Sequence, residues 1–260
     1  MTILAGRCAL SRRERSSLSM KILTIDIGGT FVKMLASGET DRRVFESGPG
    51  LTPGRMAARV KQLARGWSYD VVSIGYPGPV RNNRPAAEPR NLGKGWMRFN
   101  FEAAFKCPVK IVNDAAMQAL GSYRGGTMLF LGLGTGLGAA LMVRGHIVPL
   151  ELGNLSFRRG TVEDYLGIRG LQRLGRKKWQ KLVEAYVDRI IPALQVDEVV
   201  LGGGNVKKLE KLPRGCRAGD NDHAFAGGFL LWKSYRQRSR LNRPDTGVKY
   251  KKASLEKPQG

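Results

Sequence analysis

The hydrophobic residues of this chain occur in short runs whose spacing alternates between that of strands and that of helices. Continuous apolar runs that end in glycine or in a polar turn predict buried β-strands. These runs occupy residues 21–27, 69–75, 108–112, 127–133, 138–143 and 198–201, and residues 31–46 suit a returning hairpin. Apolar residues three or four positions apart predict helices at residues 54–65, 115–123 and 172–191. Alternating strands and helices indicate an α/β fold.

Three of the predicted strands run into glycine-rich turns, where a backbone can press closely against a bulky ligand. The turns are Gly28-Gly29-Thr30, Gly134-Thr135-Gly136 and Gly202-Gly203-Gly204, the last followed by Asn205. Backbone N–H groups in such turns can point at phosphate oxygens. The spacing matches neither the P-loop nor the G-x-G-x-x-G dinucleotide motif. The first two turns therefore predict a phosphate clamp with a threonine hydroxyl on each side, and the third would lie beneath the base and ribose of a nucleotide.

Charged side chains flank the first turn and open the helix predicted at residues 115–123. Asp26 precedes the first turn, where its carboxylate could hold a water or a metal ion beside the phosphates, and Lys33 adds a cation. Asp114 follows a predicted buried strand and opens the helix, so we expect its carboxylate to point into a cleft as a general base. The alternative is that Asn113 or Asp114 is only the N-cap of that helix.

The chain is strongly basic, with a formal net charge of +23, and both of its ends add to this excess. Residues 1–19 hold four arginines and one glutamate, and residues 233–260 hold nine lysines or arginines and two acids. We interpret residues 1–19 as a disordered extension or a mis-assigned start, and residues 233–260 as a basic disordered tail. A basic body favours an anionic partner such as polyphosphate or a nucleotide. A generally basic proteome is an equal alternative.

The length of the apolar runs and the number and spacing of the cysteines indicate the cellular compartment of the protein. No apolar run approaches the ~20 residues that are needed to span a bilayer. The three cysteines are widely scattered, and none of them pairs at metal-site spacing. A sparse, odd number of cysteines is typical of a reducing compartment. We therefore expect a cytoplasmic protein with no membrane partner.

Seven short motifs follow one another in an order that resembles the ROK sugar kinases. They are DIGGT-x-x-K from Asp26, the Pro77-Gly78 turn, PRNLGKGW from Pro89, NDA from Asn113, GTGLG from Gly134, ELG from Glu151 and GGGN from Gly202. Within that family the chain looks most similar to the polyphosphate glucokinases and glucomannokinases. The resemblance implies the actin-like, hexokinase-type ATPase fold. Its two α/β lobes, residues 20–112 and 113–232, would close over a cleft.

The resemblance also implies roles for individual residues, with Asp114 as the general base. It assigns the hexose to Gly78, Asn91, Asn113, Glu151, Asn154 and Glu163, the donor phosphates to Asp26, Gly28, Gly29, Thr30, Lys33, Gly134, Thr135 and Gly136, and the nucleotide to Gly202, Gly203, Gly204 and Asn205. Mg²⁺ would be held by Asp26 through water. Asn154 stands where many relatives have histidine, which puts sugar specificity in doubt. No cysteine lies between Cys107 and Cys216, so the zinc site of many relatives is not expected.

The sequence thus predicts a hexose kinase that transfers a phosphoryl group from polyphosphate, ATP or both to the 6-hydroxyl of glucose, with mannose as a second acceptor. Basic residues between Arg169 and Lys181 form either a polyphosphate-binding strip or the solvated face of a helix. Two other functions stay open: a strictly ATP-dependent kinase for another sugar, and a basic polyanion-binding protein with impaired catalysis. Nucleic acid is not an expected partner, and a homodimer stays open.

Overall fold

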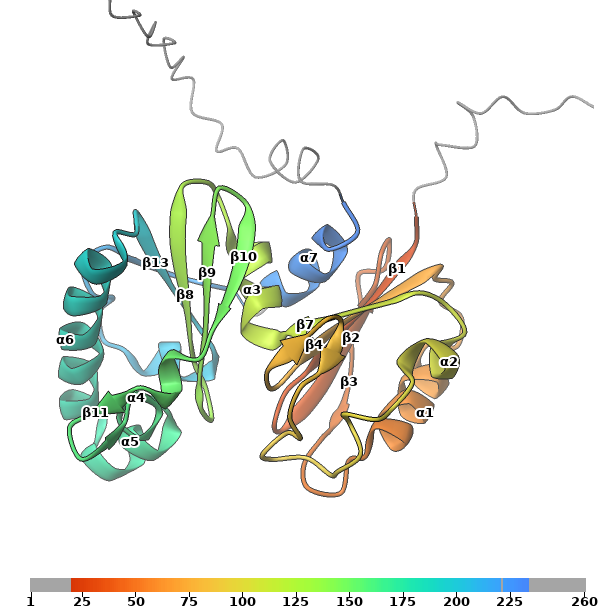
Figure 1. Cartoon of the computed structure of the whole chain (residues 1–260), viewed down its shortest axis with the longest axis horizontal. Helices are drawn as coiled ribbons and strands as arrows, with labels where there is room; N and C mark the ends of the chain where they lie inside the picture. The colour runs from red at the N-terminus through yellow and green to blue at the C-terminus, as the bar shows by residue number, and fades with distance from the viewer. Residues whose placement is uncertain (1–19, 221, 234–260) are drawn as a thin grey trace, which may run out of the picture.

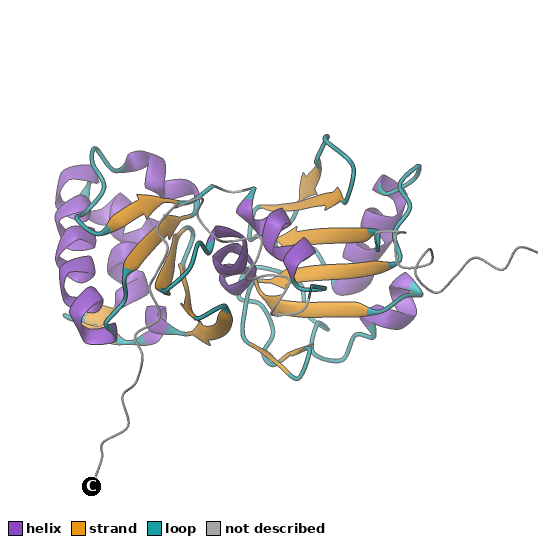
Figure 2. Ribbon diagram, turned by 90° about the horizontal axis from the view of Figure 1, so that it is seen from above, coloured by secondary structure: helices purple, strands orange, loops and turns teal. Residues whose placement is uncertain are grey.

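The computed structural model of the chain describes residues 20–220 and 222–233 (Figure 1). The predicted extension at residues 1–19 lies outside the described residues, as does the predicted tail at residues 233–260 apart from Lys233. Within the described part, two five-stranded sheets stand side by side, with helices on their outer faces and helices between them (Figures 1 and 2). The prediction of an α/β fold is confirmed.

The first sheet, with helices α1 (Pro53–Leu63) and α2 (Phe101–Phe105) on its outer face, forms the N-terminal lobe. Its strand order is β3-β2-β1-β4-β7. The strands are β1 (Ile22–Ile27), β2 (Phe31–Ala36), β3 (Arg43–Glu46), β4 (Val71–Tyr76) and β7 (Val109–Asn113). Strands β1, β4 and β7 are parallel, so their carboxyl ends meet at one edge of the sheet. Strands β1 and β4 are buried at every position, which explains why their sequences are continuous apolar runs.

The second sheet, with the order β10-β9-β8-β13-β14, forms the core of the C-terminal lobe. The strands are β8 (Thr127–Leu133), β9 (Leu137–Val143), β10 (His146–Leu150), β13 (Glu198–Gly202) and β14 (Cys216–Ala218). Helices α4 (Val162–Leu166), α5 (Ile168–Leu174) and α6 (Arg176–Leu194) cover its outer side. Trp179, Val183 and Val187 of α6 are buried against this sheet.

The prediction of a single helix over residues 172–191 is wrong. The structure has two helices there, α5 and α6, which meet at Gly175. Gly175 has φ of +74°, a backbone conformation that glycine adopts without the steric cost that a side chain brings. The apolar spacing runs through the junction, so periodicity alone cannot show the break.

Helices α3 (Asp114–Ser122) and α7 (His223–Leu230) lie between the two sheets (Figures 1 and 2). They cross at two glycines. A Cβ atom on Gly121 would lie 1.9 Å from the carbonyl oxygen of His223, and one on Gly227 would lie 1.8 Å from that of Met117. Side chains at these positions would therefore force the helices apart. The α3–α7 pair forms the central connection between the lobes.

Helix α7 also fastens the end of the described chain to the first sheet. The Ser73 hydroxyl of β4 donates a hydrogen bond of 2.6 Å to the carbonyl of Gly228, and the Trp232 indole N–H donates to the Ser73 hydroxyl at 2.9 Å. Lys110 of β7 donates to the carbonyl of Leu231 at 2.8 Å. The chain thus passes between the lobes through α3 and returns through α7.

Several short elements were not predicted, because each is too short to show a period. They are β5 (Val80–Arg81), β6 (Arg84–Pro85), β11 (Ser156–Phe157), β12 (Gly160–Thr161) and the 3₁₀-helices η2 (Leu152–Asn154) and η3 (Gly204–Lys208). In the described part of the chain, no helix has the length and apolar character that crossing a membrane requires.

Candidate active site

A cavity of about 720 Å³ lies between the two lobes, at the edge where β1, β4 and β7 end. Thirteen of the predicted site residues line it: Gly28, Gly29, Gly78, Asn91, Asn113, Asp114, Gly134, Thr135, Gly136, Glu151, Asn154, Glu163 and Gly203. Residues that are far apart in the sequence therefore meet in one cleft. The predicted site residues that do not line it are Asp26, Thr30, Lys33, Gly202, Gly204 and Asn205.

Asp114 lies at the start of α3, with its neighbour Asn113 serving as the cap of that helix. The Asn113 side-chain oxygen accepts a hydrogen bond of 3.1 Å from the backbone N–H of Ala116. The amide group of Asn113 donates to the carbonyl of Gly78 at 3.1 Å, which ties the Pro-Gly turn to the helix. Both the oxygen and the nitrogen of the Asn113 side-chain amide therefore have hydrogen-bond partners. Because Asn113 provides the cap, the alternative that Asp114 is the N-cap is wrong.

The Asp114 carboxylate lines the cleft, and one of its oxygens accepts a hydrogen bond of 2.8 Å from the backbone N–H of Ala115. Burial raises the pKa of Asp114 to about 7, and the nearby Asp26 carboxylate adds to this rise. A carboxylate with a pKa near neutrality holds a proton more firmly than an ordinary aspartate does. It is therefore better matched to accepting a proton from a hydroxyl group.

Asp26, at the end of β1, approaches Asp114 across Gly75. A Cβ atom on Gly75 would lie 3.4 Å from the Asp26 carboxylate oxygen and 3.4 Å from the Asp114 Cα. Asp26 is only 8% exposed, and burial raises its pKa to about 6 while its cross-strand neighbour Lys33 opposes the rise. From the sequence, Gly75 is predicted only as the end of a strand. Its role is visible only when β4 is placed between β1 and α3.

The first and second glycine turns face each other from opposite lobes. A Cβ atom on Gly29 would lie 4.0 Å from the Thr135 hydroxyl and 3.6 Å from the Asn91 amide nitrogen. The first turn is held in shape by a hydrogen bond of 2.9 Å from the Gly28 N–H to the Phe31 carbonyl. This arrangement is what a clamp on a phosphate chain requires. Thr30 is exposed and lies outside the lining of the cavity.

The third glycine turn supports the second. The Asn205 amide donates a hydrogen bond of 2.8 Å to the carbonyl of Gly134, so this side chain is turned toward the second turn. The N–H of Gly134 lies 3.1 Å from the carbonyls of both Gly132 and Gly136, and Ile168 N–H donates to the Gly134 carbonyl at 3.1 Å. The second turn is thus held from several sides.

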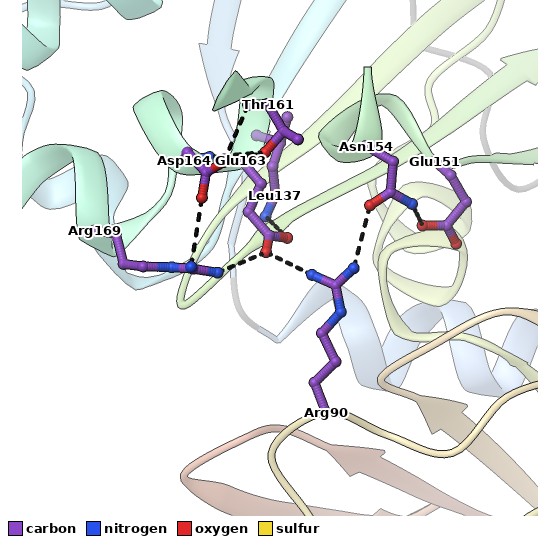
Figure 3. Close-up of polar contacts among 8 residues, drawn as sticks. All are labelled: Arg90, Leu137, Glu151, Asn154, Thr161, Glu163, Asp164 and Arg169. Atoms are coloured by element: carbon purple, nitrogen blue, oxygen red, sulfur yellow. Dashed lines mark hydrogen bonds and ion pairs between the residues drawn. The ribbon is translucent and has the colours of Figure 1, made fainter. Parts of the chain in front are cut away.

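The other end of the cleft carries the predicted hexose-binding carboxylates, and an arginine that was not predicted (Figure 3). Arg90 donates to Glu163 Oε1 at 3.0 Å and to the side-chain oxygen of Asn154 at 3.3 Å. The Asn154 amide in turn donates to Glu151 at 3.4 Å. Burial raises the pKa of Glu151, against the effect of Arg90 and with a smaller contribution from Glu163. The only signal for Arg90 in the sequence is its place directly before Asn91 in the PRNLGKGW motif.

The basic residues of the strip predicted between Arg169 and Lys181 differ in whether they reach the cavity. Arg169 lines the cleft and pairs with Glu163 and Asp164, each at 3.4 Å. Arg173 donates to the Asp164 carbonyl at 3.0 Å, and Arg176 donates to the Lys208 carbonyl at 2.5 Å. Arg169 is therefore the member of the strip that reaches the cavity.

The chain is similar in sequence to proteins of a known family. Residues 22–153, half of the chain, match the ROK family. The chain belongs to this family. The matched residues include Asp26, the first two glycine turns and Asp114. A polyphosphate glucokinase from Mycobacterium tuberculosis is 26% identical to the chain over 211 residues, which cover 72% of the chain and 78% of that relative.

Solved structures of ROK proteins share the fold. The polyphosphate/ATP-glucomannokinase from an Arthrobacter species superimposes with a TM-score of 0.71 at 22% identity, covering 82% of this chain and 98% of that one. A ROK family glucokinase from Streptomyces griseus, solved with glucose and AMPPNP, gives a TM-score of 0.66 at 18% identity, with 81% and 98% covered. The expected actin-like ATPase fold is therefore confirmed, and the family implied by the motif order is the one found.

Proposed function

We propose that this ROK protein is a hexose kinase that transfers a phosphoryl group to the 6-hydroxyl of glucose, with mannose as a second acceptor and polyphosphate, ATP or both as donors. The observation that carries the proposal is the position of Asp114. Its carboxylate lines the cleft that contains the two facing glycine turns, and Asn113 provides the helix cap in its place. The name of the mycobacterial relative supports the same reading.

In the proposed reaction, the donor phosphates lie between the Gly28-Gly29 turn and the Gly134-Thr135-Gly136 turn. The N–H groups of Gly28 and Gly134 donate within their own turns. The backbone N–H groups of Gly29, Thr135 and Gly136 and the Thr135 hydroxyl offset the charge that develops on the transferring phosphoryl group. Asp114 accepts the proton of the sugar 6-hydroxyl as the hydroxyl oxygen attacks the phosphorus atom of the donor. The bond between that phosphorus and the rest of the donor breaks, and the rest of the donor leaves with the electron pair of that bond.

The side chains near the proposed donor phosphates are of a kind that binds magnesium. Mg²⁺ is usually bound by one or two carboxylates, with waters and substrate phosphates completing its shell. Asp26 and Asp114 are two carboxylates on either side of Gly75, of which Asp114 lines the cavity, and the described residues contain no cluster of three or more His, Cys, Asp or Glu side chains that could hold a metal ion. Asp26 would hold the ion through water, and the ion would supply charge neutralisation on the donor phosphates.

The acceptor end has the side chains that a hexose needs. Asn91 of the N-terminal lobe and Glu151, Asn154 and Glu163 of the C-terminal lobe line the cavity and offer carboxylate and amide groups to sugar hydroxyls. Glu163 is the most firmly held of them, because Leu137 N–H donates to its other oxygen at 3.2 Å. Its fixed position makes it the best candidate for orienting the sugar so that the 6-hydroxyl faces Asp114.

For the donor, the basic strip supports polyphosphate. Arg169 lies in the lining of the cleft, where it pairs with Glu163 and Asp164, and Arg176, Lys177 and Lys178 follow it in the sequence at the start of α6. A chain of phosphates leaving the cleft would meet this positive charge. Because such contacts release bound counterions, polyphosphate affinity should fall steeply with salt.

An assay of hexose 6-phosphate formation by the full-length protein tests the proposal. Glucose, mannose and other hexoses are each offered with Mg²⁺ and either polyphosphate or ATP. Turnover of glucose with polyphosphate is the expected result. Turnover with ATP alone would remove the polyphosphate donor and keep the kinase. No turnover of any hexose with either donor would contradict the proposal and favour a polyanion-binding protein, which the net charge of +23 would suit.

A further inference from the structure

Arg90 joins the two lobes across the acceptor end of the cleft. It lies in the loop between β6 and α2 of the N-terminal lobe, whereas its partners Glu163 and Asn154 belong to the C-terminal lobe (Figure 3). One nitrogen of the guanidinium group reaches the carboxylate and the other reaches the amide oxygen. The planar fork of arginine suits two simultaneous acceptors, which a lysine could not satisfy with the same geometry.

The loop that carries Arg90 is held firmly on its own lobe. The Glu88 carboxylate accepts hydrogen bonds from the backbone N–H groups of Gly95 at 3.0 Å and Trp96 at 3.1 Å. The Tyr76 hydroxyl donates to the Ala87 carbonyl at 2.7 Å, and the Trp96 ring is fully buried. The starting point of the Arg90 side chain is therefore fixed relative to β4.

The carboxylate that receives Arg90 is also fixed. Glu163 Oε1 accepts from Arg90 and Arg169, and Glu163 Oε2 accepts from the Leu137 N–H at 3.2 Å. Gly136 lies directly beneath it, since a Cβ atom there would be 2.4 Å from Oε2. Arg90 thus connects a rigid loop of one lobe to a rigid carboxylate of the other.

The Arg90 contacts lie away from the α3–α7 connection, and this position determines which movement of the lobes they oppose. In Figure 1, α3 and α7 bridge the lobes in the upper part of the molecule, while α4, which carries Glu163, lies in the lower part. A rotation of the lobes about the α3–α7 connection would separate Arg90 from Glu163. The Arg90 contacts therefore oppose opening of the cleft at its acceptor end.

We propose that Arg90 is a positioning residue that joins the lobes through Glu163 and Asn154 before the acceptor binds, and so presents these two side chains in their binding orientation. The inference rests on the proposed hexose kinase, since Glu163 and Asn154 are the groups that would meet the sugar. Arg90 acts on acceptor binding through Glu163 and Asn154. It takes no part in transfer of the proton or the phosphoryl group.

A double-mutant cycle on the full-length protein tests this role. Arg90→Gln should raise the glucose KM about threefold while kcat and the donor KM stay the same, because a largely exposed charge-assisted contact at the binding site is lost. In a Glu163→Gln background the same change should lower kcat/KM by a smaller factor than in the wild type, since residues that act through one another are not additive and only the Asn154 contact of Arg90 remains. Arg98→Gln is the matched control, an exposed arginine of the same loop, and should leave all constants unchanged.

Hydrogen exchange of the acceptor-free protein gives a second readout that does not depend on activity. Backbone N–H groups of residues 161–167 should exchange faster in Arg90→Gln than in the wild type and in Arg98→Gln. Unchanged exchange would overturn the proposal. So would an unchanged glucose KM, or an equal loss of kcat/KM with and without Glu163, which would mean that Arg90 binds the sugar directly. If the wild type phosphorylates no hexose, the proposed function fails, and the exchange comparison alone decides the role of Arg90.

Discussion

The two ends of the cleft are built from different parts of the protein. The proposed donor end consists mainly of backbone, with the turns at Gly28-Gly29 and Gly134-Gly136 facing each other from opposite lobes. The proposed acceptor end consists mainly of side chains, with Glu163, Asn154 and Arg90 linked by hydrogen bonds across the lobes. Backbone donors recognise phosphate whatever is attached to it, whereas side chains set which sugar fits. The donor end is therefore expected to tolerate different phosphoryl donors, and specificity is expected to depend on the acceptor end.

The largest expected effect lies where the two ends meet, at Asp114. Asp114→Asn should lower kcat at least about a thousandfold, because removal of a general base in such sites costs up to ~10⁴-fold. Hexose binding, measured by calorimetry, should change little, since the amide keeps the shape of the side chain. A variant that retained more than a tenth of wild-type turnover would mean that another group accepts the proton.

Thermal unfolding of the same variant provides a control for folding. Burial raises the pKa of Asp114 to about 7 in the folded protein, so its ionised form destabilises the fold. Asp114→Asn should therefore unfold at a higher temperature than the wild type at pH 8. The difference should shrink as the pH falls below 7, because the wild-type carboxylate then takes up its proton.

Gly136→Ala tests whether the two ends of the cleft are independent. The new methyl group would lie 2.4 Å from Glu163 Oε2, so a change in a donor-end turn should displace an acceptor-end carboxylate. We expect kcat/KM for glucose to fall about a hundredfold, in line with misplacement of a binding group by about 1 Å. Steady-state kinetics with both substrates varied would show it.

Gly54→Ala is the matched control for that substitution. Its methyl group would meet only the ring of Phe99, at 3.9 Å, which is an ordinary contact. It should leave kcat/KM unchanged. If Gly136→Ala affected only the donor KM, the two ends would be independent, contrary to our description.

The pH dependence of the reaction reports on the ionisation of Asp114. The pKa values of Asp114 and Asp26 are raised to about 7 and about 6, and Asp114 must be ionised to accept a proton. The value of kcat/KM should therefore rise about tenfold per pH unit below pH 7 and level off above it. A pH profile that is flat from pH 5 to pH 8 would contradict the assignment of Asp114 as the base.

The smallest expected effect concerns the basic strip beyond the donor end. Replacing Lys177 and Lys178 together by glutamine should raise the polyphosphate KM about threefold at low salt, and the difference should vanish at high salt as the charges are screened. The ATP KM should stay the same. Equal effects on both donors would mean that these lysines do not follow a long phosphate chain.

The donor end could be predicted from the sequence because its signals are local. Glycines that follow apolar runs mark strands and turns within a few residues, and the predicted strands at residues 21–27, 69–75 and 127–133 correspond to β1, β4 and β8. The position of Asp114 at the start of a helix followed in the same way. That the two turns face each other, however, depends on how the lobes pack, and local sequence does not show this.

Arg90 and helix α7 could not be predicted, because the residues that explain them are distant in the sequence. Arg90 meets Glu163, 73 residues away, and nothing near Arg90 indicates that partner. Helix α7 has apolar residues around most of its surface and two adjacent glycines, so its sequence lacks a helical stripe. Its two glycines are explained only by distant partners, since a Cβ atom on Gly227 would meet the backbone of Met117 in α3 and one on Gly228 would meet Thr24 in β1.

Direct detection of the product by ³¹P NMR tests the central claim, with glucose, polyphosphate and Mg²⁺ added to the full-length wild type and, in parallel, to Asp114→Asn. The account predicts that the phosphomonoester signal of glucose 6-phosphate grows with the wild type and stays absent with the variant. Equal growth of that signal in both samples, or growth of inorganic phosphate alone, would contradict it.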